Sequence, residues 1–166
     1  MPYRSRPIDP EGQDLAGLDS GEPDLDRWLR EHAAGAEARR VARTFVWLDA
    51  QQDAVVGYYS LVGHRLVRSE LPRAVGHGSP AEIPAVLVAR LALDRRLHGG
   101  GLGGVLLADA LERIVEATQI VAARFVVVDA LHPTAAGFYK HHGFRPIPGT
   151  LRLVQKVPDI AVSLGH

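Results

Sequence analysis

The segment from residue 84 to residue 111, PAVLVARLALDRRLHGGGLGGVLLADAL, limits the possible folds of this chain more than any other part of the sequence. An apolar run from Val86 to Leu93 leads into charged residues 94–96, and an apolar segment of helical periodicity follows later. Five glycines fall within six positions between these parts: Gly99, Gly100, Gly101, Gly103 and Gly104. This order predicts a β-strand, a glycine loop and an α-helix in direct succession.

The predicted junction between loop and helix has the properties of an anion-binding site. Glycine lacks a Cβ atom, so the backbone can turn sharply and bring its N–H groups against a ligand. The first turn of a helix adds unpaired N–H donors and a partial positive charge, which suit a phosphate group. A flexible turn that binds nothing is the alternative interpretation of the same glycines.

Two common nucleotide-binding motifs do not fit this segment. A Walker-type site needs Lys followed by Ser or Thr after the glycines, and that pair is missing here. A dinucleotide-binding fold carries an acidic residue about 20 residues later, at the end of the next strand. Here Glu112 and Glu116 lie on the predicted helix instead. The glycine loop is therefore expected to hold a phosphate of another kind of ligand.

Length and composition fit a single globular domain that spans residues 1–166, with 46% hydrophobic and 23% charged residues. No apolar run approaches the roughly 20 residues of a membrane span, and the segment MPYRSRPIDPEG is not an apolar signal region. The sequence contains no cysteine, which excludes disulfides and thiolate chemistry. No spacing of His, Asp and Glu indicates a metal site. We expect a cytoplasmic protein without membrane contact.

Charge is unevenly distributed although the formal net charge is zero. Residues 1–38 hold nine acids and four bases, whereas residues 39–96 hold nine bases and five acids. A basic middle segment favours phosphate-bearing ligands, and a solvated mixed surface is the alternative. Seventeen of the nineteen bases are arginine, whose forked guanidinium suits phosphate.

Periodicity and turn residues predict the other elements. A helix is expected from about Asp24, with Trp28 and His32 on its buried face. Tyr58 and Tyr59 are expected on opposite faces of one strand. Residues 63–83 are expected to form an irregular connection, part of it a short helix or a lid. Further strands are expected at Tyr3–Ile8, Val41–Leu48, Ala54–Val62, Arg124–Ala130 and Leu151–Val157 (an edge or hairpin strand), and helices at Gly103–Thr118 and Thr134–His142.

Two motifs resemble the Gcn5-related N-acetyltransferase (GNAT) superfamily. The segment HGGGLG, residues 98–103, fits the family pattern R/Q-x-x-G-x-G/A except at His98. The segment AAGFYKHHGF, residues 135–144, resembles the family element A-x-x-x-Y-x-x-x-G-F. Both motifs occur at the family's usual separation. The resemblance implies an α/β fold with a mixed, mostly antiparallel central sheet, flanked by helices and splayed at an acetyl-CoA site.

A closer resemblance covers nearly the whole chain. SGEPDLDRWLREHA, RTFVWL, VVGYYSLVGHRL and VVVDALHPTAAGFYKHHGF look like the acetyltransferase toxins of bacterial type II toxin–antitoxin systems. Toxins similar to this chain acetylate the α-amino group of aminoacyl-tRNA and so stop translation. The resemblance also implies a ribbon-helix-helix antitoxin as partner and a homodimer.

The resemblance assigns residues to the cofactor acetyl-CoA. Strand residues 91–93 would pair with the pantetheine arm, and a backbone N–H there could polarise the thioester carbonyl. The loop would hold the pyrophosphate. Many family members carry asparagine where His132 stands. The implied cofactor-binding residues are Leu91, Ala92, Leu93, Arg96, His98, Gly99, Gly100, Gly101, Leu102, Gly103, Gly104, Leu131 and Phe138.

The resemblance also assigns Tyr139 as the general acid that protonates the departing CoA thiolate, and a packed aromatic is the alternative for this residue. His64 and Glu82 are candidates for a general base, although an aminoacyl amine with a pKa near 7.7 needs none beyond water. Candidate contacts to tRNA are Arg39, Arg40, Arg43, Arg90, Arg95 and Lys140.

The function predicted from the sequence is acetyl transfer from acetyl-CoA to the amine of aminoacyl-tRNA. One alternative is a GNAT enzyme that acts on a small-molecule or protein amine. A second alternative is a CoA-binding module without turnover.

Overall fold

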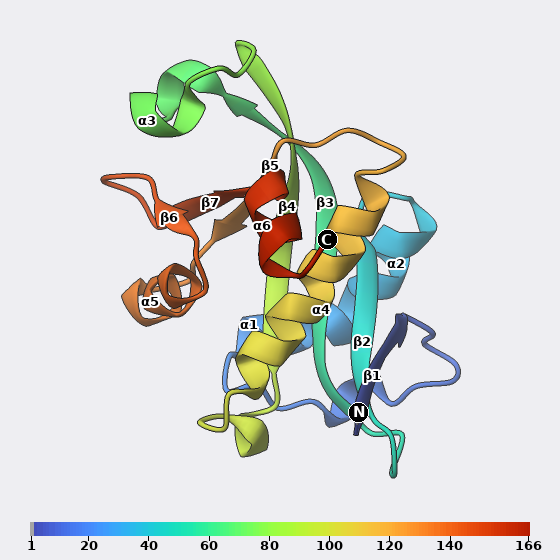
Figure 1. Cartoon of the computed structure of the whole chain (residues 1–166). Coiled ribbons are helices and arrows are strands. Elements are labelled where there is room, and N and C mark those ends of the chain that lie inside the picture. The colour runs from blue at the N-terminus through green and yellow to red at the C-terminus, as the bar shows by residue number, and fades with distance from the viewer. Residues whose placement is uncertain (1) are drawn as a thin grey trace. The chain divides into compact units, whose positions relative to one another are not determined.

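A computed structural model describes residues 2–166, and its strands form one seven-stranded sheet in the order β1-β2-β3-β4-β5-β7-β6 (Figure 1). The pairs β1–β2, β2–β3, β5–β7 and β6–β7 are antiparallel and the pair β4–β5 is parallel, so the expected mixed, mostly antiparallel sheet is confirmed. The chain divides into two compact units, Met1–Val62 with Ala89–Ala110, and Gly63–Val88 with Leu111–His166. The long strands β3 (Val55–Val67) and β4 (Glu82–Leu93) contribute to both units.

The first unit is built on β1 (Tyr3–Pro7), β2 (Arg43–Asp49) and the adjoining parts of β3 and β4. Alternate residues of these strands face opposite sides of the sheet. Val46 and Tyr58 belong to one core cluster, together with Leu29. Their chain neighbours Trp47 and Tyr59 belong to a second core cluster. The unit's helical elements are η1 (Leu15–Gly17), α1 (Pro23–Glu31), α2 (Ala33–Ala38), η3 (Arg95–Leu97) and the first part of α4 (Leu102–Ala117).

Helices cover both faces of the first unit's strands. Helices α1 and α2 supply Leu29 and Ala33 to the cluster that holds Tyr58, and α4 supplies Leu106 to the cluster that holds Tyr59. Both tyrosines are fully buried, on opposite faces as expected. Gly57 between the flanking apolar residues allows the close approach of β4, because a Cβ there would lie 2.8 Å from the Ala92 carbonyl oxygen.

The second unit contains β5 (Phe125–Asp129) between β4 and β7 (Arg152–Lys156), and β6 (Arg145–Pro146) pairs with β7. The strand expected at Arg124–Ala130 is β5, and its residues 125–128 run parallel to residues 85–88 of β4. A core of Leu66, Ile83, Phe125 and Val154 joins these strands. The unit's helical elements are η2 (Arg68–Glu70), α3 (Arg73–Gly76), α5 (Pro133–His141) and α6 (Val157–Ser163).

Several predicted elements differ from the observed ones. Strand β3 continues five residues past Val62 to Val67, where an irregular connection was expected, because Leu66 still packs into the core. The short helix expected within residues 63–83 is present as η2 and α3. His32 is exposed and caps α1 instead of facing its core. β7 forms the expected hairpin with β6 but is not an edge strand. The sequence predicts a single domain over residues 1–166. Because the chain divides into two compact units, that single domain stays a prediction.

Candidate active site

The end of β4 is fixed by a buried aspartate. Asp94 is 1% exposed, and its backbone N–H donates to the carbonyl of Val56 on β3. Its carboxylate accepts hydrogen bonds from the backbone N–H groups of Arg96 at 3.0 Å and Asp19 at 3.3 Å, and from the Arg96 guanidinium. Burial alone would raise the pKa of Asp94, but these hydrogen bonds outweigh burial and lower it. Asp94 thus caps η3 and starts the turn toward the glycines.

The backbone of β4 alternates in direction just before this turn. In an antiparallel strand the N–H and C=O of one residue face the same neighbour. Because Asp94 bonds to β3, the backbone groups of Leu93 and Leu91 point away from β3, while Ala92 points toward it. The parallel pairing with β5 covers residues 85–88 of β4, so residues 91–93 lie beyond it along the strand. Leu91 and Leu93 are therefore the residues that can offer backbone groups to a ligand.

His98 braces the same strand end. Its Nε2 donates to the Leu93 carbonyl oxygen at 2.7 Å, which ties the loop back to β4. The Arg96 guanidinium is held by Asp94, and Arg95 pairs with Asp19 at 2.7 Å. These three side chains therefore hold the turn in place, and both arginines already have carboxylate partners.

The glycine loop has the backbone conformation that its composition predicts. Gly99 and Gly101 have positive φ angles of 84° and 81°, a left-handed conformation that favours glycine. A Cβ at Gly99, Gly100 or Gly101 would meet no atom within 4 Å, so open space lies against this backbone. Gly103 and Gly104 lie in the first turn of the 16-residue helix α4, which begins at Leu102. The loop thus exposes backbone next to the N–H groups of a helix start, a suitable cradle for a phosphate.

In the second unit, α5 carries the predicted acid, Tyr139. His132 caps the helix by accepting from the Ala135 N–H at 3.2 Å, and Gly143 ends it with a φ of 93°. The Tyr139 ring lies edge-on to Phe138 and Phe144, with centroids 5.2 and 5.8 Å away. Its burial raises the pKa of Tyr139 to about 12, so the phenol is protonated at neutral pH. A protonated hydroxyl is the state that a general acid needs.

The other cofactor residues predicted in this unit differ in exposure. Leu131, before α5, is 57% exposed, and Phe138 is half-buried beside Tyr139. His132 uses its Nδ1 to cap α5, which is the role that an asparagine at this position can also perform.

The two candidate bases have other partners. His64 Nε2 accepts from the Arg152 guanidinium at 3.0 Å, and burial together with the Arg152 charge lowers the pKa of His64. Arg152 is itself held by Asp129 through two hydrogen bonds of 2.7 and 2.8 Å. Glu82 pairs with Arg65 on the surface. Sequence reasoning missed the Asp129–Arg152–His64 cluster, because only the pairing of β5 with β7 brings Asp129 opposite Arg152.

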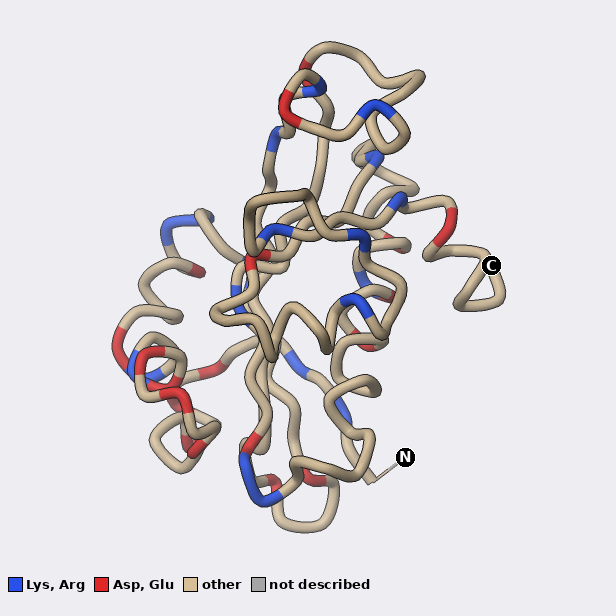
Figure 2. The backbone as a smooth tube through the Cα atoms, turned by 90° about the vertical axis from the view of Figure 1, so that its left-hand side faces the viewer, with Lys and Arg blue, Asp and Glu red and all other residues tan. Residues whose placement is uncertain are grey.

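Some of the predicted tRNA contacts have interaction partners within the chain, whereas others are exposed. Arg43 pairs with Glu37, Arg95 pairs with Asp19, and the Arg90 guanidinium lies 3.9 Å from the ring centre of Trp28. Arg39, Arg40 and Lys140 are exposed. Figure 2 shows basic and acidic positions interspersed along most of the chain. All of these candidates except Lys140 belong to the first unit.

Among the described residues, 2–166, no group of three or more His, Asp or Glu side chains is placed to hold a metal ion. No helix of that range is long and apolar enough to cross a membrane.

Comparison with known proteins decides the family. No family model matches the chain. It is 35% identical over 156 residues to the tRNA-acetylating toxin of Mycobacterium tuberculosis, and the match covers 93% of each chain. The chain belongs to this family of GNAT-type acetyltransferase toxins.

Solved structures of other toxins in this family agree with the fold. AtaT complexed with acetyl-methionyl-tRNAfMet is 28% identical, with a TM-score of 0.87, and the match covers 97% of this chain and 98% of that one. A Tyr-to-Phe variant of AtaT, bound to the C-terminus of the antitoxin AtaR and acetyl-CoA, is 26% identical, with a TM-score of 0.85 and full coverage of both chains. The GNAT fold predicted from the two motifs is therefore confirmed.

Proposed function

We propose that this chain transfers the acetyl group of acetyl-CoA to the α-amino group of aminoacyl-tRNA and acts as a toxin that blocks translation. The glycine turn carries the cofactor part of this proposal, because Gly99 and Gly101 leave open space against backbone that leads into α4. The relative named as a tRNA-acetylating toxin, at 35% identity, supports the acceptor. An enzyme acting on a small amine has no comparable observation in its favour.

The residues of the glycine loop would hold the pyrophosphate of acetyl-CoA through backbone N–H groups. The guanidinium of Arg96 would add little, since Asp94 already binds it. The outward-facing backbone groups of Leu91 and the N–H of Leu93 would pair with the pantetheine arm, since His98 already binds the Leu93 carbonyl oxygen, and one N–H would polarise the thioester carbonyl as an oxyanion donor does.

Tyr139 would protonate the sulfur as it leaves. The neutral α-amine attacks the thioester carbonyl, the C–N bond forms, and the C–S bond of the tetrahedral intermediate then breaks. The phenol gives its proton to the departing sulfur and is reprotonated by the proton that the amine nitrogen loses, so the products are an amide and the free thiol of CoA. The amine of an aminoacyl ester, with a pKa near 7.7, is largely neutral at slightly alkaline pH without a general base.

The partners follow from the same family. We propose that an antitoxin of the ribbon-helix-helix class neutralises this chain. The complex of AtaT with the C-terminus of its antitoxin AtaR supports an antitoxin as the partner. We also propose that the toxin forms a homodimer and acts in the cytoplasm, where aminoacyl-tRNA is present.

The test combines the purified chain, aminoacyl-tRNA and acetyl-CoA, with mass analysis of the aminoacyl group. We expect N-acetylated aminoacyl-tRNA and inhibition of a cell-free translation system that depends on acetyl-CoA. Unmodified aminoacyl-tRNA together with unimpaired translation would exclude the proposal.

A conservative pair of variants tests the role of Tyr139. Tyr139→Phe is expected to bind acetyl-CoA as the wild type does and to lose turnover by roughly 10²-fold or more, the usual contribution of a general acid. Tyr58→Phe is the matched control, because Tyr58 is also a buried tyrosine but donates to the Leu25 carbonyl oxygen at 2.6 Å. Equal turnover by the two variants would remove Tyr139 from the reaction.

A further inference from the structure

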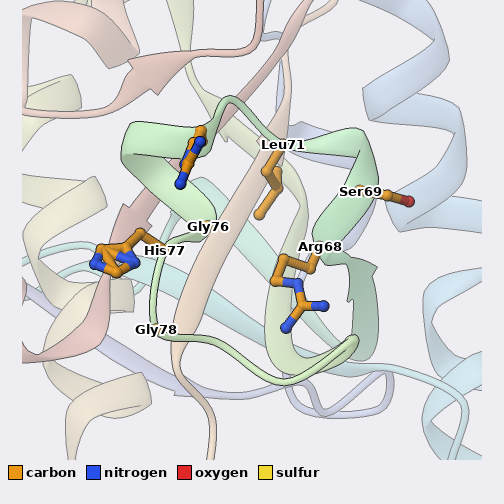
Figure 3. A pocket seen from close by; sticks show the side chains of 7 residues that line it. Arg68, Ser69, Leu71, Gly76, His77 and Gly78 are labelled. Atoms are coloured by element: carbon orange, nitrogen blue, oxygen red, sulfur yellow. The ribbon is translucent and has the colours of Figure 1, made fainter.

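The connection between β3 and β4 encloses a pocket of about 380 Å³ that none of the roles above uses (Figure 3). Residues from η2, α3 and the turn after α3 line it, and Figure 3 shows Arg68 and His77 on opposite sides of this loop. The lining residues are Arg68, Ser69, Leu71, Arg73, Gly76, His77 and Gly78. The pocket lies wholly within the second unit.

The pocket has a defined backbone frame. The Arg68 N–H donates to the Ala81 carbonyl oxygen at 2.9 Å, which joins the two ends of the connection. Leu71 and Val75 are buried in the core cluster of the second unit and anchor η2 and α3 to it. Gly76 lets the Arg68 stem lie close, because a Cβ on this glycine would come within 3.2 Å of Arg68 Cγ.

Two guanidinium groups bind one buried residue, Ser79, which directly follows the lining residue Gly78 in the chain. Arg68 donates to the Ser79 carbonyl oxygen at 2.7 Å, and Arg124 donates to the Ser79 hydroxyl oxygen at 2.8 Å. The Arg124 guanidinium also lies 3.8 Å from the position of a Cβ on Gly78, a pocket residue with a φ of 81°. Two like charges are thus held toward the same small region, which favours an anion there.

No carboxylate neutralises these charges. Within residues 2–166, Arg68, Arg73 and Arg124 form no ion pair with an acid at 4.0 Å or less. The acid of the same connection, Glu70, does not line the pocket. Its negative charge instead contributes to raising the pKa of Arg152. Figure 2 shows both basic and acidic positions along this connection, at the top of the view. By contrast, Arg65 at the end of β3 is paired with Glu82.

We propose that this pocket binds the phosphate backbone of the tRNA, an inference that rests on the proposed function. Guanidinium forks bind phosphate oxygens well, and backbone contacts of this kind hold a nucleic acid in register without reading its sequence. The apolar side chain in the lining, Leu71, is buried, so the pocket offers no exposed apolar anchor of the kind that a protein partner uses. An RNA phosphate therefore fits the pocket better than an acidic peptide does.

The experiment measures the affinity of the full chain for bulk deacylated tRNA by fluorescence anisotropy at several salt concentrations. The test variant is Arg68→Gln with Arg73→Gln, because glutamine retains a donor for the Ser79 carbonyl. Loss of two phosphate contacts is expected to lower the slope of log affinity against log salt by roughly 1.5, and affinity near 0.1 M salt by about tenfold per contact. The control, Arg65→Gln, removes one equally positive but acid-paired charge and is expected to change the slope little.

Gly76→Ala provides a variant that keeps every charge. Its added methyl group displaces the Arg68 stem, so tRNA affinity is expected to fall while the net charge is unchanged. Urea midpoints measured on all variants identify any that have lost the fold. In that case the tRNA measurement is made with His77→Gln, which changes another residue that lines the pocket.

The outcomes separate the two proposals. Unchanged tRNA affinity and salt slope in the pocket variants, with wild-type acetylation of aminoacyl-tRNA, overturn the pocket and leave the function intact. Weaker tRNA binding by the variants, with no acetylation by the wild type, supports the pocket and overturns the function. Absence of tRNA binding by the wild type overturns the pocket. The same variants are also measured with a polyglutamate peptide. If they bind tRNA as the wild type does but no longer bind a peptide that the wild type binds, the RNA assignment is overturned in favour of a protein partner.

Discussion

Asp94→Ala tests whether one buried carboxylate holds the turn that leads into the glycine loop. Asp94 is 1% exposed and accepts hydrogen bonds from two backbone N–H groups, those of Arg96 at 3.0 Å and Asp19 at 3.3 Å. A hydrogen bond to a charged group contributes about 1.5–3 kcal/mol, and the longer bond belongs at the lower end. We therefore expect the free energy of unfolding to fall by roughly 3–4.5 kcal/mol, which corresponds to a Tm lower by roughly 6–18 °C.

Urea unfolding followed by far-UV circular dichroism measures this change, and the affinity for CoA provides a second readout. Asp53→Asn is the control, because Asp53 is largely exposed and has one ion pair, with Arg4 at 3.1 Å. Such an exposed pair contributes at most about 1 kcal/mol, and asparagine tolerates the positive φ of 52° at this position. Similar unfolding energies for Asp94→Ala and Asp53→Asn would refute the role given to Asp94.

The pH dependence of the free energy of unfolding also tests the stabilising role of the Asp94 carboxylate. The pKa of Asp94 is lower in the folded chain than its unfolded value of about 3.9. A carboxylate with a depressed folded pKa contributes stability above the unfolded pKa, and this contribution is lost as the pH falls through the folded pKa. The difference in unfolding energy between wild type and Asp94→Ala is therefore expected to shrink as the pH falls below about 4.

Two further predictions concern the glycine loop and the general acid. Gly101→Ala is expected to cost roughly 1–2 kcal/mol of unfolding energy, because alanine is strained at a φ of 81°, whereas Gly100→Ala, also in open space, is expected to cost less. Thermal unfolding of both variants decides this point. Acetyl transfer is expected to rise with pH up to about 8 as the amine loses its proton, and then to stay level until the pH nears the Tyr139 pKa of about 12. A fall in kcat between pH 8 and 10, measured with a stable chain, would contradict the protonation state assigned to Tyr139.

Segments with strong periodicity were predicted closely. The helix expected at Gly103–Thr118 is Leu102–Ala117, and the one expected at Thr134–His142 is Pro133–His141. Apolar residues on one face and a glycine or proline at the end define such helices in the sequence itself. The short helices α2 and α6 were not predicted, and α6 was missed although it has a proline in its first turn and Gly165 just after its end.

The polar half of β3 was missed for a different reason. Gly63-His64-Arg65 lacks the apolar alternation that indicates a strand, and the pairing that keeps it extended is a long-range property. The same limit applies to the site. The glycines and Tyr139 could be named from local motifs, whereas the partners of Asp94, His98 and Arg152 depend on segments far apart in the chain.

Ion pairing inside the chain determines which arginines are available for phosphate. The sequence directs attention to Arg95 and Arg96, because they adjoin the glycines, but Asp19 and Asp94 bind their guanidinium groups. A phosphate at the loop would then be held chiefly by backbone N–H groups, which suits the pyrophosphate of a bound cofactor that approaches the backbone closely.

Arg68 and Arg73 have the opposite arrangement, since they are distant from the motif in the sequence and have no acid partner among residues 2–166. Unpaired guanidinium groups can release counterions when a polyanion binds, whereas paired ones must first break an existing salt bridge. The charge that attracts tRNA is thus expected on the arginines of the β3–β4 connection and not on those that adjoin the glycines in the sequence, so that cofactor binding and tRNA binding depend on salt to different extents.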